Sequence, residues 1–186
     1  MKKSIIGSLV GAIILFIWQF LSWTALDLHR AAQDYTPKQD SILAYLSANL
    51  EKEGGYLMPH TPKGSSFEEA ENLAAKSIGK PWITIQYHTS MQYNMGMNMV
   101  RVFLVNVLVI WILCWLLSKF ANNDFLTTLY SSLMVGVIVY LNSSYTSHIW
   151  YNIFDIRAFL IDAIAMWGLT GVWLGWWLNR KTALSS

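Results

Sequence analysis

Charged residues are scarce in this sequence: lysine, arginine, aspartate and glutamate together make up 13% of its 186 residues. The basic side chains are scattered rather than clustered, which excludes the basic patch of a nucleic-acid-binding protein. Cysteine occurs once, as Cys114, so no disulfide can form within the chain. Cysteine usage therefore gives no information about the redox compartment.

The motifs that identify common enzymes are also missing. The sequence has no histidine pair at metal-binding spacing, no glycine-rich phosphate loop, no nucleophile elbow and no Cys-x-x-Cys. No histidine falls inside a long apolar run, which argues against a haem held by two histidines. His148 and Asp155 could form an outward-facing acid–base pair, but a histidine among aromatic residues is more often structural. We therefore expect a protein that works by binding rather than by catalysis.

Apolar residues, by contrast, are abundant, at 54% of the chain, and ten of them are tryptophans. This composition is too apolar and too aromatic for a soluble domain of this size. Four runs approach the roughly 20 residues that a helix needs to cross a bilayer. We therefore predict an integral membrane protein, mainly α-helical, with a bundle of four transmembrane helices. The predicted spans are residues 1–26, 100–117, 125–145 and 158–178.

The first span has a possible alternative, because Lys2 and Lys3 followed by an apolar run are also typical of a signal peptide. The run continues through Phe16 and Trp23, however, and is longer and more aromatic than the core of a usual signal peptide. No convincing cleavage site follows it. We expect a retained membrane anchor.

Three groups of basic residues adjoin the spans on one side of the predicted membrane, and the positive-inside rule makes that side the cytoplasm. Residues 27–99 carry six basic against eight acidic side chains and belong on the other side. We expect a bacterial-type cytoplasmic (inner) membrane, with both termini and the tail 179–186 cytoplasmic and residues 27–99 extracytoplasmic. The flanking basic residues are Lys2, Lys3, Lys119, Arg180 and Lys181.

The segment 27–99 is predicted to form a small α+β cap inserted between the first two spans. Its first helix should begin at a capping box of Thr36 and Gln39, and its second at a capping box of Ser66 and Glu69. Two β-branched or aromatic stretches favour strands. With few large apolar groups, the cap should lean on the bundle for stability. The expected order is a helix to Leu50, a strand at 56–58, a helix to about Ser77 and a strand at 82–88.

Polar side chains inside the predicted spans fall at a common depth, within roughly 6 to 11 Å of the outer boundary at 1.5 Å per residue. Facing lipid would cost each of them several kcal/mol, so we expect them to face the bundle interior. His29 and Arg30 crowd the mouth above them. The candidate layer comprises Gln19, Asn106, Asn142 and Asp162 within the spans, with Arg101, His148, Asp155 and Arg157 at the mouth.

Asp162 is the acidic residue of this layer that reaches membrane depth, and we expect it to pair with Arg101 or Arg157. One interpretation is an outward-opening pocket in which Asp162 binds or relays a cation or a proton. The other is a set of interhelical hydrogen bonds and one ion pair that fix helix register. The second is favoured, because proton pathways usually need a chain of acidic groups.

Small residues indicate where the helices approach one another. Gly7 and Gly11 near the start of the first span, and Gly171 and Gly175 near the end of the fourth, have the four-residue spacing that lets backbones pack closely. Their depths match, so we expect the first and fourth spans to be antiparallel neighbours there. The short loop at 119–124 predicts an antiparallel hairpin of the second and third spans.

Methionines precede the second span at Met91, Met95, Met97 and Met99. Thioether sulfur is a soft ligand that suits Cu(I), so copper handling is one hypothesis. Methionine is also an adaptable packing residue, which is the commoner use.

Taken together, the sequence favours an accessory or assembly subunit of a larger membrane complex, with the lipid bilayer and other membrane-protein subunits as partners. The alternatives are an outward-facing binder or transporter of a small molecule or ion that uses the Asp162 layer, and copper handling through Met91–Met99.

Overall fold

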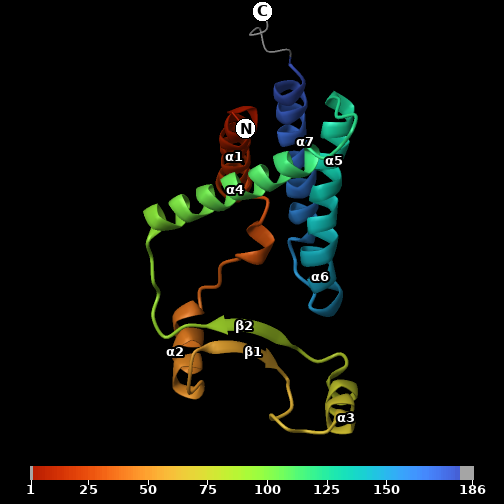
Figure 1. The fold of residues 1–186 in the computed structure, drawn as a ribbon. Helices are drawn as coiled ribbons and strands as arrows, with labels where there is room; N and C mark the ends of the chain where they lie inside the picture. Colours follow the sequence, from red (N-terminus) through yellow and green to blue (C-terminus); the bar gives the residue numbers. More distant parts are fainter. Residues whose placement is uncertain (1, 181–186) are drawn as a thin grey trace, which may run out of the picture. The chain divides into compact units, whose positions relative to one another are not determined.

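The computed structural model describes residues 2–180, which form two compact units (Figure 1). The larger unit combines the chain up to Asp34 with the chain from Asn94 onward, and the smaller unit is Tyr35–Tyr93. Each unit is considered by itself. Lys181 and the rest of the predicted tail beyond Arg180 lie outside the described residues.

The larger unit contains four helices that are long and apolar enough to cross a membrane, as predicted. Between the first and second of them lies the small α/β segment, so the predicted fold class is confirmed. The helices are α1 (Lys2–Phe20), α4 (Met95–Leu117), α5 (Phe125–Val139), α6 (Thr146–Trp150) and α7 (Ile156–Asn179). The first span ends in a wide π-helical turn, Leu21–Ala25, and the third contains one, Tyr140–Tyr145, between α5 and α6.

Helix α7 is central to this unit, because it packs against α1 on one side and along α5 on the other. Helix α4 packs against α1, so the helices follow one another in the order α4, α1, α7, α5. Figure 1 shows α5 and α7 side by side along their length. The expected hairpin of α4 and α5 is wrong as a packed pair: the two helices contact each other only sparsely. Helix α4 instead packs against α1, which is distant in sequence, and α5 packs against α7, the next long helix along the chain.

The core of the larger unit lies where α1, α4 and α7 meet. Ile110 and Leu117 of α4 and Leu174 of α7 are fully buried there. The outward faces of the same helices remain apolar and exposed, for example at Leu104 and Trp111. Such faces suit a hydrocarbon solvent, in which an exposed leucine carries no penalty.

Close helix contacts are made at glycine, but not with the pairing expected. A Cβ on Gly7 would lie 3.2 Å from Leu174 of α7, so α1 and α7 are indeed neighbours, and they run antiparallel. A Cβ on Gly11 would instead meet Ile110 of α4 at 2.8 Å. Gly171 and Gly175 face α5, where a Cβ on Gly175 would lie 2.8 Å from Phe125. The two glycine pairs therefore do not face each other, because α7 turns its small residues toward α5.

The smaller unit has the predicted order of helix, strand, helix and strand. Its two strands are antiparallel, with Gly54 opposite Tyr87. The capping box of Ser66 and Glu69 is formed, with both of its hydrogen bonds present. The box expected at Thr36 is not, because the first helix begins two residues later, after Lys38. The elements are α2 (Gln39–Asn49), β1 (Gly54–Met58), α3 (Phe67–Ser77) and β2 (Ile83–Tyr87).

Candidate functional site

The site begins with a reversal of the chain just beyond the first span. The π-helical turn Leu21–Ala25 is followed by Asp27, whose φ of 48° lies in the left-handed region that aspartate tolerates better than most residues. The Leu28 amide then donates back to the Ser22 carbonyl at 2.9 Å. This tight return places His29 over the end of its own helix, where it is 2% exposed.

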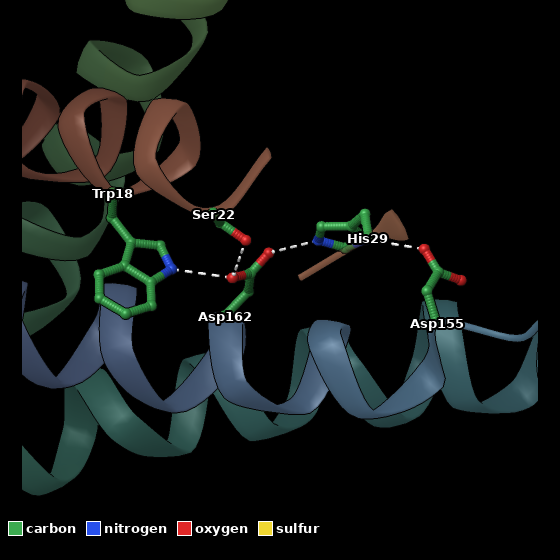
Figure 2. Close-up of polar contacts among 5 residues, drawn as sticks. All are labelled: Trp18, Ser22, His29, Asp155 and Asp162. Carbon is green, nitrogen blue, oxygen red and sulfur yellow. Dashed lines mark hydrogen bonds and ion pairs between the residues drawn. The ribbon is translucent and has the colours of Figure 1, made fainter. Parts of the chain in front are cut away.

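His29 lies between two aspartates of the fourth span (Figure 2). Its Nδ1 is 2.7 Å from Asp155 Oδ2, and its Nε2 is 3.0 Å from Asp162 Oδ2. Asp155 directly precedes α7 and Asp162 lies within it. Seven residues correspond to nearly two full helical turns, so both side chains are on one face, with their Cα atoms about 10 Å apart along the axis. A single imidazole ring joins the two carboxylates.

The second oxygen of Asp162 is used by α1 and its π-helical turn. Trp18 Nε1 donates to Asp162 Oδ1 at 2.8 Å, and Ser22 Oγ donates to the same oxygen at 2.7 Å. Trp18 and Ser22 are four residues apart and share one face of the helix. Asp162 is therefore bonded through both oxygens, and it is 6% exposed. Every one of these donors comes from the first 29 residues of the chain.

Two aromatic rings cover the imidazole. Trp23 stacks on His29 with ring centroids 3.9 Å apart and planes 3° from parallel. Phe159 of α7 meets the same ring edge-on at 4.8 Å. These rings exclude water and strengthen the polar contacts they cover. A tryptophan face also attracts a cationic ring more than a neutral one.

The hydrogen-bond inventory fixes how many protons the three ionisable groups share. Each His29–carboxylate contact needs one hydrogen between its two heavy atoms. Two protons must therefore lie on the line Asp155–His29–Asp162, either as an imidazolium between two carboxylates or as a neutral ring with one protonated acid. Both distributions carry a net charge of −1.

The expected arginine partners of Asp162 are not its partners. Arg101 and Arg157 are exposed, and neither forms an ion pair with this carboxylate. Arg157 is five residues from Asp162, which places it about 140° around the helix. Arg101 is on α4, which packs against α1 rather than α7. The prediction is wrong because donors on α1 and its following turn occupy the carboxylate.

The remaining residues of the predicted polar layer are divided among separate places. Gln19 and Asn106 form a reciprocal amide pair between α1 and α4, at 2.9 and 3.5 Å. Asn142 is exposed in the π-helical turn of the third span, so it does not face the interior. His148 does not pair with Asp155, because its Nδ1 accepts from the Ile153 amide at 3.1 Å and holds a local turn.

The methionines do not form a converged set of ligands on α4. Met97 is about 200° around the helix from both Met95 and Met99, so the helix itself directs it to the opposite side. All three side chains are exposed, as is Met91 in the smaller unit. Among residues 2–180, no group of three or more histidine, cysteine, aspartate or glutamate side chains is placed to hold a metal ion.

These features define the class of the protein. It is a multi-pass helical membrane protein whose first and fourth spans are joined by a buried Asp–His–Asp line. Comparison with protein-family models, with curated proteins and with solved structures finds no match to this chain.

Proposed function

We propose that this chain is a non-enzymatic accessory or assembly subunit of a larger membrane complex, and that its smaller unit is the part that docks on a partner protein. The proposal rests on one observation about the smaller unit. No side chain in Tyr35–Tyr93 is buried. A folded unit without a core of its own depends on another surface for its stability.

The exposed surface of the smaller unit is rich in large apolar groups. Phe67 is 78% exposed and Ile78 is 81% exposed. An open hollow of about 660 Å³ lies between α2 and β2, with Leu43, Leu46 and Ile85 in its lining. The sheet has two strands, so each has an unpaired edge to which a partner strand can add. Two-stranded sheets are marginal alone, and a partner would stabilise this one.

The contacts of Asp162 support a structural role for this site over ligand binding, transport or catalysis. Both oxygens of Asp162 are bonded to side chains, and two rings cover the adjoining imidazole. A site that is ready for a ligand usually leaves polar groups converging on open space. Here they converge on one another and fix α1 and its following turn against α7.

We place the protein in a bacterial-type cytoplasmic membrane with both termini inside and residues 27–99 outside. Three basic residues, Lys3, Lys119 and Arg180, support this orientation because they lie at the same end of the helix bundle. Lys3 Nζ donates to the Arg180 carbonyl at 2.8 Å, and Lys119 follows the end of α4, which runs antiparallel to α1. The positive-inside rule assigns that end to the cytoplasm.

Cysteine accessibility tests the docking role. In a Cys114→Ser background, Ile78→Cys should react slowly with a maleimide in native membranes and several-fold faster in the purified monomer, because the partner covers it. Lys63→Cys, in an exposed loop of the same unit, is the matched control and should react quickly in both. Equal rates for Ile78→Cys in membranes and in the purified monomer would contradict the proposal.

A second function, proton relay at the outer face, is favoured by one observation: Asp155, His29 and Asp162 form a line of three ionisable groups. Proteoliposomes with an internal pH dye would reveal it as flux that Asp162→Asn abolishes. Replacing Gln19 and Asn106 together by leucine removes the neighbouring polar pair and should leave that flux intact. A wild-type protein without flux would exclude this function.

A further inference from the structure

We propose that the seam between α1 and α7 binds one anionic phospholipid, with an acyl chain in an apolar groove and the phosphate at Arg180. The inference concerns a site that is separate from the Asp162 line and from the smaller unit. It depends on three features: the lining of the groove, the cation at its end and the absence, among residues 2–180, of an ion pair between that cation and a carboxylate.

The groove has a volume of about 490 Å³ and lies between α1 with the start of its π-helical turn on one side and α7 on the other. Its polar atoms are turned away from it. The indole N–H of Trp18 donates to Asp162, and that of Trp173 donates to the Gly7 carbonyl at 3.2 Å. The surface that remains suits a hydrocarbon chain. The lining residues are Ile14, Ile17, Trp18, Leu21, Leu169, Val172, Trp173 and Trp176.

A guanidinium lies at one end of this groove. The Arg180 guanidinium is centred 3.5 Å from the Trp177 ring and 5.4 Å from the ring of Trp176, which lines the groove. Stacking of this kind holds the guanidinium plane in place while its N–H groups remain able to bind phosphate oxygens. Lys3 Nζ donates to the backbone carbonyl of Arg180 at 2.8 Å and adds a second positive charge at this end of α1 and α7.

Arg180 has no carboxylate partner among the described ion pairs of residues 2–180, which join His29 to two aspartates and Arg30 to Asp27. Two cations next to an apolar groove complement a molecule with a negative head and an apolar tail. An anionic phospholipid has that form. A zwitterionic lipid is a poorer fit, because its ammonium group would be repelled by Lys3 and Arg180.

Native mass spectrometry of the purified full chain in detergent tests this site with two probes, dioleoyl phosphatidylglycerol and dioleoyl phosphatidylcholine. We expect one molecule of the glycerol lipid to bind, and Arg180→Gln to weaken it about tenfold, the loss expected for a charged hydrogen bond. Lys119→Gln is the matched control. Its ammonium lies over a tryptophan ring in the same way, 5.2 Å from Trp115, but away from the groove, so affinity should not change.

A second pair of variants tests the groove itself. Val172→Trp fills it and should weaken the lipid several-fold, whereas Val105→Trp places the same bulk on the exposed face of α4 and should not. Ile17→Trp fills the groove from the α1 side and replaces Val172→Trp in this test if that variant does not fold. Equal affinity for both lipids, equal losses in Arg180→Gln and Lys119→Gln, or unchanged binding with the groove filled would each overturn the proposal.

Discussion

His29 Nε2 lies 3.0 Å from Asp162 Oδ2, so a residue beyond the first span closes over a carboxylate within the fourth. A charged group buried in a membrane cannot be solvated by water, so it needs several hydrogen-bond donors from the protein. Asp162 obtains two donors, Trp18 and Ser22, at one oxygen, and its other oxygen bonds to His29. Because all three belong to α1 or the turn after it, the same bonds hold α1 and α7 in one register.

Asp162→Asn should destabilise the protein. An amide accepts through one oxygen only, so with that oxygen on Trp18 and Ser22 its NH₂ group faces His29 Nε2, and the contact between the imidazole and a carboxylate is lost. Breaking a buried ionic contact in this way costs about 3 kcal/mol. Unfolding of the purified protein by a denaturing detergent would measure the loss. Asp27→Asn is the control, since Asp27 pairs with Arg30 on the exposed surface, and a change below about 1 kcal/mol is expected there. Equal effects of the two variants would show that the Asp162 contacts stabilise nothing.

His29 and Asp155 should be energetically coupled. Their side chains are 2.7 Å apart and almost fully buried, so removing either one leaves the other without its partner. A double-mutant cycle with His29→Ala and Asp155→Ala should give a coupling energy of about 1 to 3 kcal/mol. The same cycle between His29 and His148 should give none, because His148 bonds to the Ile153 amide instead. Additive effects of His29→Ala and Asp155→Ala would contradict a direct bond between them.

Most features of this fold that are local in sequence could be predicted, although the box expected at Thr36 does not form, and those that depend on a return of the chain could not. The Ser66 capping box is set by two residues three positions apart, and it forms as expected. The position of His29 depends on a π-helical turn and on the left-handed Asp27, neither of which has a strong sequence signal. A search for carboxylates seven residues apart at a helix start, such as Asp155 and Asp162, would have indicated a shared partner. Arg101 and Arg157 lie close to the depth of Asp162 in the predicted membrane, and their positive charge made them the expected partners of this carboxylate.

Gly136→Ala should force α5 and α7 apart. A Cβ at this position would lie 2.5 Å from Trp167 and 2.6 Å from the Ala163 carbonyl, and the backbone cannot yield as a flexible side chain does. We expect a loss of about 1 to 3 kcal/mol, the usual cost of overpacking. Gly168→Ala on α7 is the matched control. Its nearest neighbour would be Leu133 at 3.5 Å, an ordinary contact, so this change should be neutral or slightly stabilising. Unfolding in a denaturing detergent would measure the stability of the two variants. Similar losses of stability would show that the close contact at Gly136 does not determine how α5 and α7 pack.

Acid should loosen the two-stranded sheet of the smaller unit. Hydrogen bonds from the Thr89 hydroxyl, at 2.7 Å, and from the Thr89 amide, at 2.8 Å, hold the pKa of Glu53 below its usual value of 4.5. A carboxylate whose pKa is depressed by folding contributes stability that is complete above the unfolded pKa and is lost as the pH falls through the folded one. Glu53 precedes β1 and Thr89 follows β2, so this contact closes the open end of the sheet. Hydrogen exchange of the β1 amides should therefore show less protection below pH 4.5 than at neutral pH, after correction for the intrinsic rates. Thr89→Val removes the hydroxyl donor and should make this pH dependence smaller while leaving β1 paired. An unchanged dependence in that variant would mean that a group other than Glu53 controls the acid response.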